Sequence, residues 1–375
     1  MMARILKIVC VLLAATLVFG AAMYLDRVHG THTVETQPRE PRIWETESSQ
    51  PQTEPTETEP AQTETQAPET EPVETEPESF RLTFVGDCTL GCRDSHAYID
   101  YGFIKVIGDD YGHPFRNFVD YFENDDFTMV NLEGALCDEG YPVDKTHTFR
   151  GPTSYVSILT DNSVEAVTLA NNHTLDYGQK GYDTTVATLE TAAMPYVERD
   201  SSTIVTTESG LTVGIYAAVY YLFDEADMTA EIAALRKQAD VVVFAPHWGV
   251  EGTYHPTEQQ IKLAYAAIDA GADIVYGSHP HVLQPIEEYN GGIIYYSLGN
   301  FSFGGNIYPE DYDTAMIQQE VIREADGSIH LGETLIVPAC LSSISGRNNF
   351  QPTPYAEGSA EYERVLAKLD GSWKN

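Results

Sequence analysis

Residues 272–281 read Ala272-Asp273-Ile274-Val275-Tyr276-Gly277-Ser278-His279-Pro280-His281, an apolar, strand-like run that ends in two histidines. In an open α/β sheet, ligands gather at the carboxyl ends of the strands. Because side chains alternate along a strand, we expect both imidazoles to point to one side. The stretch therefore predicts an α/β fold with a ligand site at one edge of its sheet.

Several other apolar runs also end in side chains that bind metals. Alone, each has a simpler explanation as a turn residue, a helix cap or a solvated carboxylate. Together, imidazole, carboxylate and amide groups form a ligand set suited to Zn, Mn or Fe, so we predict one or two divalent ions. The strand ends carry Asp87, Asn131 with Glu133, Asn171-Asn172-His173, and His247 with Glu251.

Such a ligand set is typical of phosphoester hydrolysis. Two ions bridged by a carboxylate activate water and stabilise the phosphoryl oxygens. A nearby histidine that does not bind metal then protonates the leaving oxygen. The residues are therefore compatible with a hydrolytic metal site.

Strand-like and helix-like segments alternate from about Phe80 onward, and the later part is more antiparallel. This pattern predicts one α/β domain, a layered β-sandwich with sheets inside and helices outside. Expected strands are 81–86, 128–132, 166–170, 211–217, 241–246, 273–277, 293–298, 315–323 and 330–337, and expected helices are 154–160, 181–192, 229–239, 257–270 and 359–369. The 257–270 helix is bounded by Pro256 and Gly271, and 289–292 is a predicted hairpin turn.

The first 79 residues predict a targeting segment followed by a stalk. Arg4 and Lys7 precede a long apolar run within residues 1–30, which fits a single-pass signal-anchor or, alternatively, a cleaved signal peptide and a secreted protein. Residues 31–79 repeat Thr, Glu and Pro, so we expect a disordered stalk. Both alternatives place the 80–375 domain outside the cytoplasm.

Charge and cysteine content narrow the function further. The net charge is −36, and the part after the stalk is strongly acidic too, so we exclude nucleic acid as a partner. Of five cysteines, Cys10 falls in the apolar run, and the other four are either paired outside the cytoplasm or small buried residues.

The motifs resemble those of the CapA family of capsule and poly-γ-glutamate biosynthesis proteins. The resemblance covers about residues 80–345, with the motifs in the family's order. They are Gly86-Asp87, Asn131-Leu132-Glu133, Asn171-Asn172-His173-Thr174-Leu175-Asp176-Tyr177-Gly178, His247-Trp248-Gly249-Val250-Glu251, Ser278-His279-Pro280-His281-Val282-Leu283-Gln284 and Ser297-Leu298-Gly299-Asn300-Phe301.

The resemblance implies a calcineurin-like metallophosphoesterase fold and assigns roles to the site residues. It suggests Asp87, Glu133, Asn172, His247, His279 and His281 as metal ligands, with Glu133 as a bridge. It makes His173 the acid for the leaving group. Asn131, Arg150 and Glu251 are expected at the substrate, although Arg150 is equally well explained as a salt-bridged residue.

One departure leaves the activity open. Metallophosphoesterases usually have histidine two residues after the first aspartate, where this chain has Thr89, so the first metal position is expected to be weak, empty or differently coordinated. One hypothesis is a metal-dependent hydrolase of a phosphoester or an anionic envelope polymer. The other is a non-catalytic accessory subunit of a membrane-embedded machinery for polymer synthesis, export or anchoring. A cation-dependent adhesin fits the stalk but leaves the histidines unexplained.

Overall fold

The computed structural model describes residues 40–45, 76–220 and 224–374. The chain divides into two units, 1–37 and 38–375, and all described residues belong to the second. The predicted signal-anchor lies outside the described residues. None of the helices in the described ranges is long and apolar enough to span a bilayer.

Two seven-stranded mixed sheets form the centre of this unit. The first has the order β1 (Arg42–Glu45), β9 (Ser201–Thr206), β10 (Thr212–Val219), β11 (Val241–His247), β12 (Ile274–Tyr276), β14 (Gly292–Tyr295) and β13 (Ile286–Tyr289). The second has the order β18 (Thr353–Pro354), β17 (Ile329–Cys340), β16 (Asp313–Arg323), β2 (Glu78–Val85), β4 (Phe127–Asn131), β7 (Ala166–Thr168) and β8 (Tyr196–Val197).

Two small strand pairs complete the described sheet structure. They are β3 (Asp87–Thr89) with β15 (Asn300–Phe303), and β5 (Ala135–Leu136) with β6 (Arg150–Gly151), and both pairs are parallel. The helices are α2 (Phe103–Ile107), α3 (Val119–Phe122), α4 (Ser157–Thr160), α5 (Gly178–Thr191), α6 (Glu225–Leu235), α7 (Glu258–Ala270) and α8 (Ala360–Leu369), with 3₁₀ turns η1 (Asp94–His96) and η2 (Thr153–Val156).

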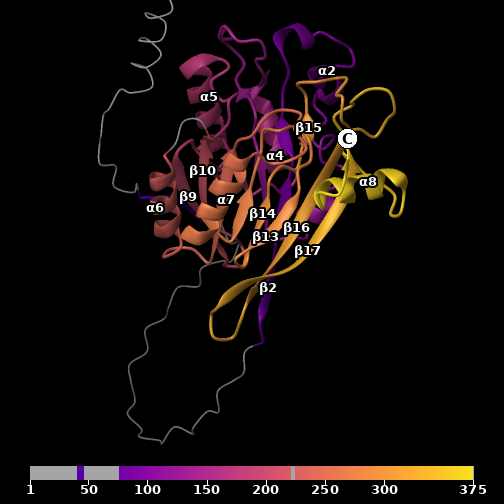
Figure 1. Cartoon of the computed structure of the whole chain (residues 1–375). Helices are drawn as coiled ribbons and strands as arrows, with labels where there is room; N and C mark the ends of the chain where they lie inside the picture. Colours follow the sequence, from indigo (N-terminus) through magenta and orange to yellow (C-terminus); the bar gives the residue numbers. More distant parts are fainter. Residues whose placement is uncertain (1–39, 46–75, 221–223, 375) are drawn as a thin grey trace, which may run out of the picture. The chain divides into compact units, whose positions relative to one another are not determined.

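The two sheets pack face to face, with helices on the outer faces (Figure 1). Alternation along β11 shows the layering: Val243 faces the core between the sheets, whereas Val242 and Phe244 pack under α6 and α7. A third apolar cluster covers the other face of the second sheet. The predicted α/β layered sandwich flanked by helices is therefore confirmed.

Local sequence signals explain where the principal helices begin and end. The Thr257 hydroxyl accepts a hydrogen bond from the backbone N–H of Gln260, and the Gln260 side-chain oxygen accepts one from the backbone N–H of Thr257. This capping box starts α7 at Glu258. Gly271, with φ of 114°, ends it as predicted. The helix expected at 229–239 is α6, which lies four residues earlier because Asp224 caps it.

The antiparallel character of the later chain is also confirmed. β16 pairs with β17 and with β2, and β13 pairs with β14. The β13–β14 turn places Asn290 and Gly291 at φ of 47° and 87°, the left-handed conformation that the predicted Asn-Gly hairpin requires.

Some described residues differ from the expected stalk and strands. Within 31–79, the apolar Ile43 and Trp44 lie in β1, which pairs with β9, and β2 begins at Glu78. The rest of the predicted stalk lies outside the described residues. Cys88, Cys92, Cys137 and Cys340 are all free, and the first three are buried.

Candidate metal centre

The carboxyl ends of parallel strands from both sheets meet at one place. β10, β11, β12 and β14 run parallel in the first sheet, and β2, β4, β7 and β8 in the second. The Tyr276 hydroxyl, at the end of β12, donates to the Val85 carbonyl at the end of β2 (2.6 Å). The donor side chains that follow these strands therefore come together from both sheets.

The histidines after β12 do not lie on a strand. β12 ends at Tyr276, and His279 and His281 have φ of 99° and 58° in the loop that follows. The expectation that strand alternation aligns them was wrong, because the left-handed backbone turns the chain at each histidine. The loop nevertheless brings the two rings to 5.9 Å between centroids.

Asp87, Glu133 and His247 form the first donor group. All three are buried, and each offers one ligand atom within 4.8 Å of the others. Asp87 follows β2, Glu133 follows β4, and His247 ends β11. Thus the two sheets contribute to the same group.

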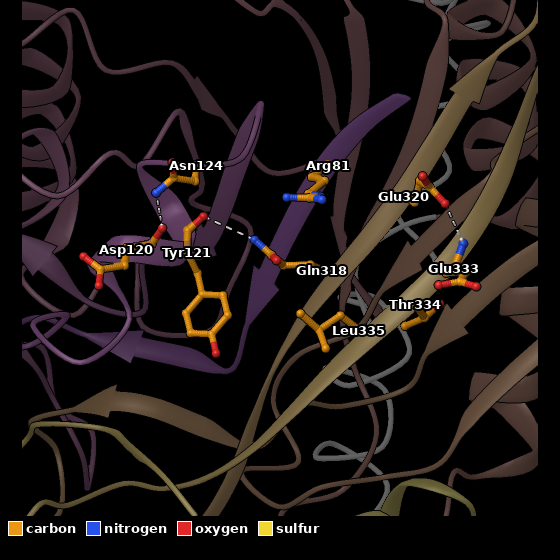
Figure 2. A pocket seen from close by; sticks show the side chains of 9 residues that line it. All are labelled: Arg81, Asp120, Tyr121, Asn124, Gln318, Glu320, Glu333, Thr334 and Leu335. Carbon is orange, nitrogen blue, oxygen red and sulfur yellow. Dashed lines mark hydrogen bonds between the residues drawn. The ribbon is translucent and has the colours of Figure 1, made fainter. Parts of the chain in front are cut away.

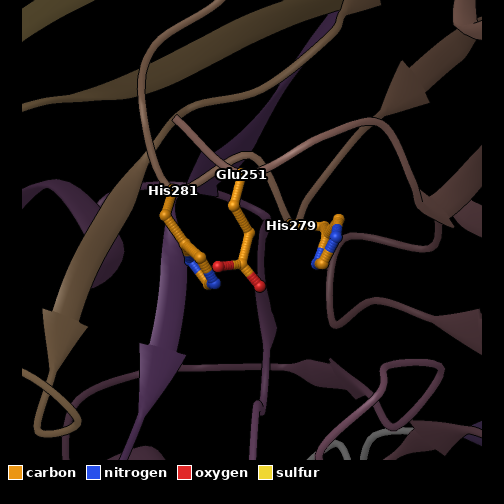
Figure 3. Close-up of side chains that lie close together, drawn as sticks. All are labelled: Glu251, His279 and His281. Atoms are coloured by element: carbon orange, nitrogen blue, oxygen red, sulfur yellow. The ribbon is translucent and has the colours of Figure 1, made fainter. Parts of the chain in front are cut away.

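Glu251, His279 and His281 form the second donor group, under the same 4.8 Å limit. Figure 3 shows the Glu251 carboxylate pointing between the two imidazoles. His281 joins the groups: its Nδ1 lies 3.1 Å from Asp87 Oδ2, and its Nε2 lies 3.6 Å from Glu133 Oε1. Glu251, expected at the substrate, is therefore placed as a further candidate ligand.

Two buried atoms of these groups lack a hydrogen-bond partner among the described residues: Glu133 Oε1 and His279 Nδ1. The imidazoles of His173 and His281 face Glu133 Oε1 at 3.7 and 3.6 Å, beyond hydrogen-bond distance. A buried carboxylate oxygen without a partner is costly. A divalent cation in each donor group would give the oxygen of the first and the nitrogen of the second a partner, so the residues present fit a metal.

The electrostatics agree with this interpretation. Burial, reinforced by Asp87 and Glu251 against the opposing effect of His281, raises the pKa of Glu133. Burial lowers the pKa of His247, and burial together with His281 lowers the pKa of His279 to about 4. Both rings are therefore neutral at pH 7, as metal ligation requires.

His281 titrates in the opposite direction. Burial by itself lowers its pKa, but the carboxylates of Glu133 and Asp87 outweigh burial and raise it. Its Nδ1 also contacts Asn300 Oδ1 at 2.9 Å. The His281 ring thus lies between two acids that favour its protonated form, and strongly perturbed pKa values of this kind cluster at functional sites.

Beside the donor groups lies His173, the predicted acid. Its Nδ1 is 2.6 Å from Asp176 Oδ2, and its ring packs 4.5 Å from that of Phe149. Burial lowers the pKa of His173, and Asp176 opposes this effect. Lys145 completes the arrangement, with Nζ 2.7 Å from the Asn172 carbonyl and 3.0 Å from Asp176 Oδ1.

Asn172 and Asn131 contact the donor groups in different ways. Asn172 Oδ1 lies 2.9 Å from His247 Nε2, so its side-chain oxygen points toward a residue of the first donor group. Asn131 Nδ2 instead donates to Asp87 Oδ1 (2.8 Å), and its Oδ1 accepts from Asn171 Nδ2. Because Asn131 is fully buried and held on both sides, it orients Asp87, and its predicted contact with substrate stays a prediction.

Arg150 is held by partners outside the two donor groups. Its Nε donates to Asp94 Oδ1 (2.9 Å), and its guanidinium stacks over the Tyr177 ring at 4.6 Å. This is the salt-bridged alternative for Arg150. The cation that contacts the site is Lys145, which the sequence analysis missed because it lies in a polar, irregular loop without a motif.

Other residues also support the site. Ser278 Oγ lies 2.9 Å from His247 Nδ1. Asp176, Ser278 and Asn300 all lie within the quoted motifs, and Asp176 could also have been found from its spacing three residues after His173. Gly86 permits the approach of β2 to the Gly299–Asn300 backbone, since a Cβ there would lie 2.5 Å from the Gly299 carbonyl oxygen. Thr89 is fully buried, and its hydroxyl has no partner in the described structure.

A separate hollow lies over β2, β16 and β17, outside the two donor groups (Figure 2). It has a volume of about 430 Å³ and is lined by Arg81 and the acids Asp120, Glu320 and Glu333, among others. It contains none of the site's imidazoles. The candidate metal ligands therefore lie at the strand ends and not in this hollow.

The sequence and structure are similar to those of known proteins. Residues 81–305 match the family described as bacterial capsule synthesis protein PGA_cap. The chain is 31% identical to capsule biosynthesis protein CapA of Bacillus anthracis, over 64% of each chain. It is 29% identical to PGA biosynthesis protein CapA of Bacillus subtilis (strain 168), over 76% of this chain and 77% of that one.

The match to the Bacillus anthracis protein thus spans less than two thirds of that protein's length. Among solved structures, NAD nucleotidase of Haemophilus influenzae aligns with a TM-score of 0.42 and 11% identity, covering 79% of this chain and 63% of that chain.

Proposed function

The chain belongs to the bacterial capsule synthesis protein PGA_cap family, and on that premise we propose that it is a divalent-metal-dependent hydrolase of a phosphoester in capsule or envelope polymer biosynthesis. One observation carries the proposal: the unpartnered, buried Glu133 Oε1, at the centre of imidazole and carboxylate donors. Most buried polar atoms of native proteins are hydrogen-bonded, and this unpaired oxygen lies among the other candidate ligands.

Asp87, Glu133 and His247 would hold one ion, and Glu251, His279 and His281 a second. The mixed nitrogen and oxygen set suits Mn, Zn or Fe. When bound, such ions supply Lewis-acid stabilisation of the phosphoryl oxygens. The imidazolium of His281 would give up its proton when a cation replaces it beside Glu133 and Asp87.

His173 would act as the acid. Asp176 accepts at Nδ1 and fixes the ring, so that Nε2 is the nitrogen on the side of Glu133. With Nδ1–H donated to Asp176, the imidazolium form of His173 also carries a proton at Nε2, and in that form it would protonate the leaving oxygen of a phosphoester bound at the donors. Lys145, between the Asn172 carbonyl and Asp176, would hold this carboxylate in place.

A second candidate function is a non-catalytic accessory subunit for polymer synthesis, export or anchoring. Thr89 favours it, because a hydroxyl stands at the buried position where metallophosphoesterases usually have an imidazole. The first metal position would then be weak, and the site would bind a ligand without turnover. In both cases we propose that the domain is tethered outside the cytoplasmic membrane and works with membrane-embedded machinery.

The test combines metal content with turnover. Purified full-length chain, wild type and His279→Ala/His281→Ala, would be analysed by metal mass spectrometry and assayed with Mn on bis(4-nitrophenyl) phosphate. The hydrolase predicts one or two ions and turnover, both lost in the double variant. Metal without turnover would support the accessory function, and the absence of metal under every loading condition would refute the proposed site.

A further inference from the structure

A cavity of about 300 Å³ adjoins the candidate metal centre. It lies where α5 begins, after the end of β7, and is closed on the other side by the turn between β8 and β9. Asn172 belongs to both places: it lines the cavity, and its Oδ1 contacts His247. A group bound in this cavity would therefore lie next to a phosphoester held at the donors.

Most polar side chains that line the cavity already bond within the protein. The Tyr182 hydroxyl donates to Glu198 Oε1, and Ser201 Oγ donates to the Glu198 carbonyl (3.0 Å). Gln179 Nε2 donates to Asp183 Oδ1 (2.8 Å). These bonds shape the wall and leave few donors for a ligand.

Arg199 is the lining residue with donors to spare. The ion pair recorded for it in the described structure is with its neighbour Asp200, at 3.5 Å, and its side chain is 47% exposed. A guanidinium presents five N–H donors, and its planar fork matches a carboxylate. In a chain with a net charge of −36, a cation at the wall of a cavity creates a local site for an anion.

The rest of the wall limits which anion fits. Leu169 and the 43% exposed Leu175 provide an apolar surface. Glu198 stands beside Arg199, so a dianion is repelled, whereas a single carboxylate is accepted. The volume is at the small end of ligand pockets, about the size of one amino acid.

We propose that this cavity binds the organic part of the substrate, an amino-acid-sized group with a carboxylate that Arg199 recognises. The inference rests on the proposed function, because it places the reacting phosphoester at the neighbouring donors. It names the substrate class: a phosphoester whose non-phosphate part carries a free carboxylate.

The experiment measures binding of N-acetyl-L-alanine, which carries a single carboxylate, to the Mn-loaded full-length chain by isothermal titration calorimetry, with its methyl ester as the uncharged probe. The wild type should bind the acid and not the ester. Arg199→Gln should weaken binding by about tenfold, the usual effect of losing a charge-assisted hydrogen bond. Arg199→Lys, which keeps the charge without the fork, should fall between the two.

Arg116→Gln is the matched control, because Arg116 pairs with Asp110 at an exposed position outside the cavity. It should bind as the wild type does. Equal binding of acid and ester, no binding to wild type, or an unchanged affinity in a folded Arg199→Gln would overturn the inference. Metal content measured on the same samples separates the two proposals. Arg199-dependent binding by a chain that takes up no metal would support the carboxylate-binding cavity and refute the metal-dependent hydrolase.

Discussion

Nδ1 of His173 lies 2.6 Å from Oδ2 of Asp176, and this contact determines which side of the ring faces Glu133. A carboxylate at one imidazole nitrogen fixes the tautomer and the orientation of the ring. Nε2 is therefore the nitrogen on the side of Glu133 Oε1, 3.7 Å away. His173 and Asp176 thus form a pair that can be tested apart from the metal ligands.

His173→Gln should lower phosphodiester turnover by about 10²–10⁴-fold, because it removes the proton donor. The bound metal, measured by mass spectrometry, should stay at the wild-type level. His330→Gln is the control, since His330 is exposed and lies beside Glu324. Turnover that survives His173→Gln unchanged would contradict the assigned role and favour an accessory function.

Lys145→Met should reduce kcat by about tenfold, because Asp176 loses a charged partner that helps to hold His173. Steady-state kinetics of the purified chain measure this effect. Lys180→Met serves as the control, because its contact with Glu139 lies between exposed side chains. Equal losses in both variants would indicate a general effect of lost positive charge.

Asp125 and Glu165 predict a stability that depends on pH, far from the donor groups. Burial, with a smaller contribution from Asp126, raises the pKa of Asp125 to about 7, and burial, with a smaller contribution from Asp125, raises the pKa of Glu165 to about 8. In the unfolded chain both lose their protons near pH 4. The folded state therefore holds more protons between pH 4 and 8, and the free energy of unfolding falls as pH rises through this range.

Urea unfolding of Asp125→Asn/Glu165→Gln should show a weaker decline of stability with pH, and a gain of about 2 kcal/mol at pH 8. Asp161→Asn, at an exposed position, is the matched control. If the double variant and the wild type show parallel profiles from pH 4 to 8, the two carboxyls do not carry the effect.

Asp313 anchors α8 to β16 through a buried charge cluster. It accepts from Arg364 and from Lys368, each at 2.7 Å, and Lys368 is almost fully buried. Asp313→Asn should lower the free energy of unfolding by about 3 kcal/mol, because it leaves a buried ammonium with weaker compensation. Adding Lys368→Met should recover part of this loss, as a double-mutant cycle in urea would show. No recovery would mean that packing, and not charge, sets the cost.

Apolar runs and strand ends predicted much of the fold and of the candidate site. β11 and α7 were predictable because their patterns extend over several residues. β9, Ser201–Thr206, was missed because its first three residues are Ser, Ser and Thr, and its apolar residues are limited to Ile204 and Val205. Lys145 was missed because only tertiary contacts bring it to Asp176. His279 and His281 were identified, but their positive φ values depend on the loop around them.

The candidate metal ligands come from strand ends of both seven-stranded sheets, and this has a consequence for the order of folding. Asp87 and the His279 amide, 3.2 Å apart, are separated by 192 positions along the chain. Contacts of such long range close late, after the entropy of a large loop has been lost. A chain with only one sheet folded presents only part of the donor set, so it cannot capture the ion as the finished domain would. Ion uptake would therefore report that both halves of the sandwich have docked.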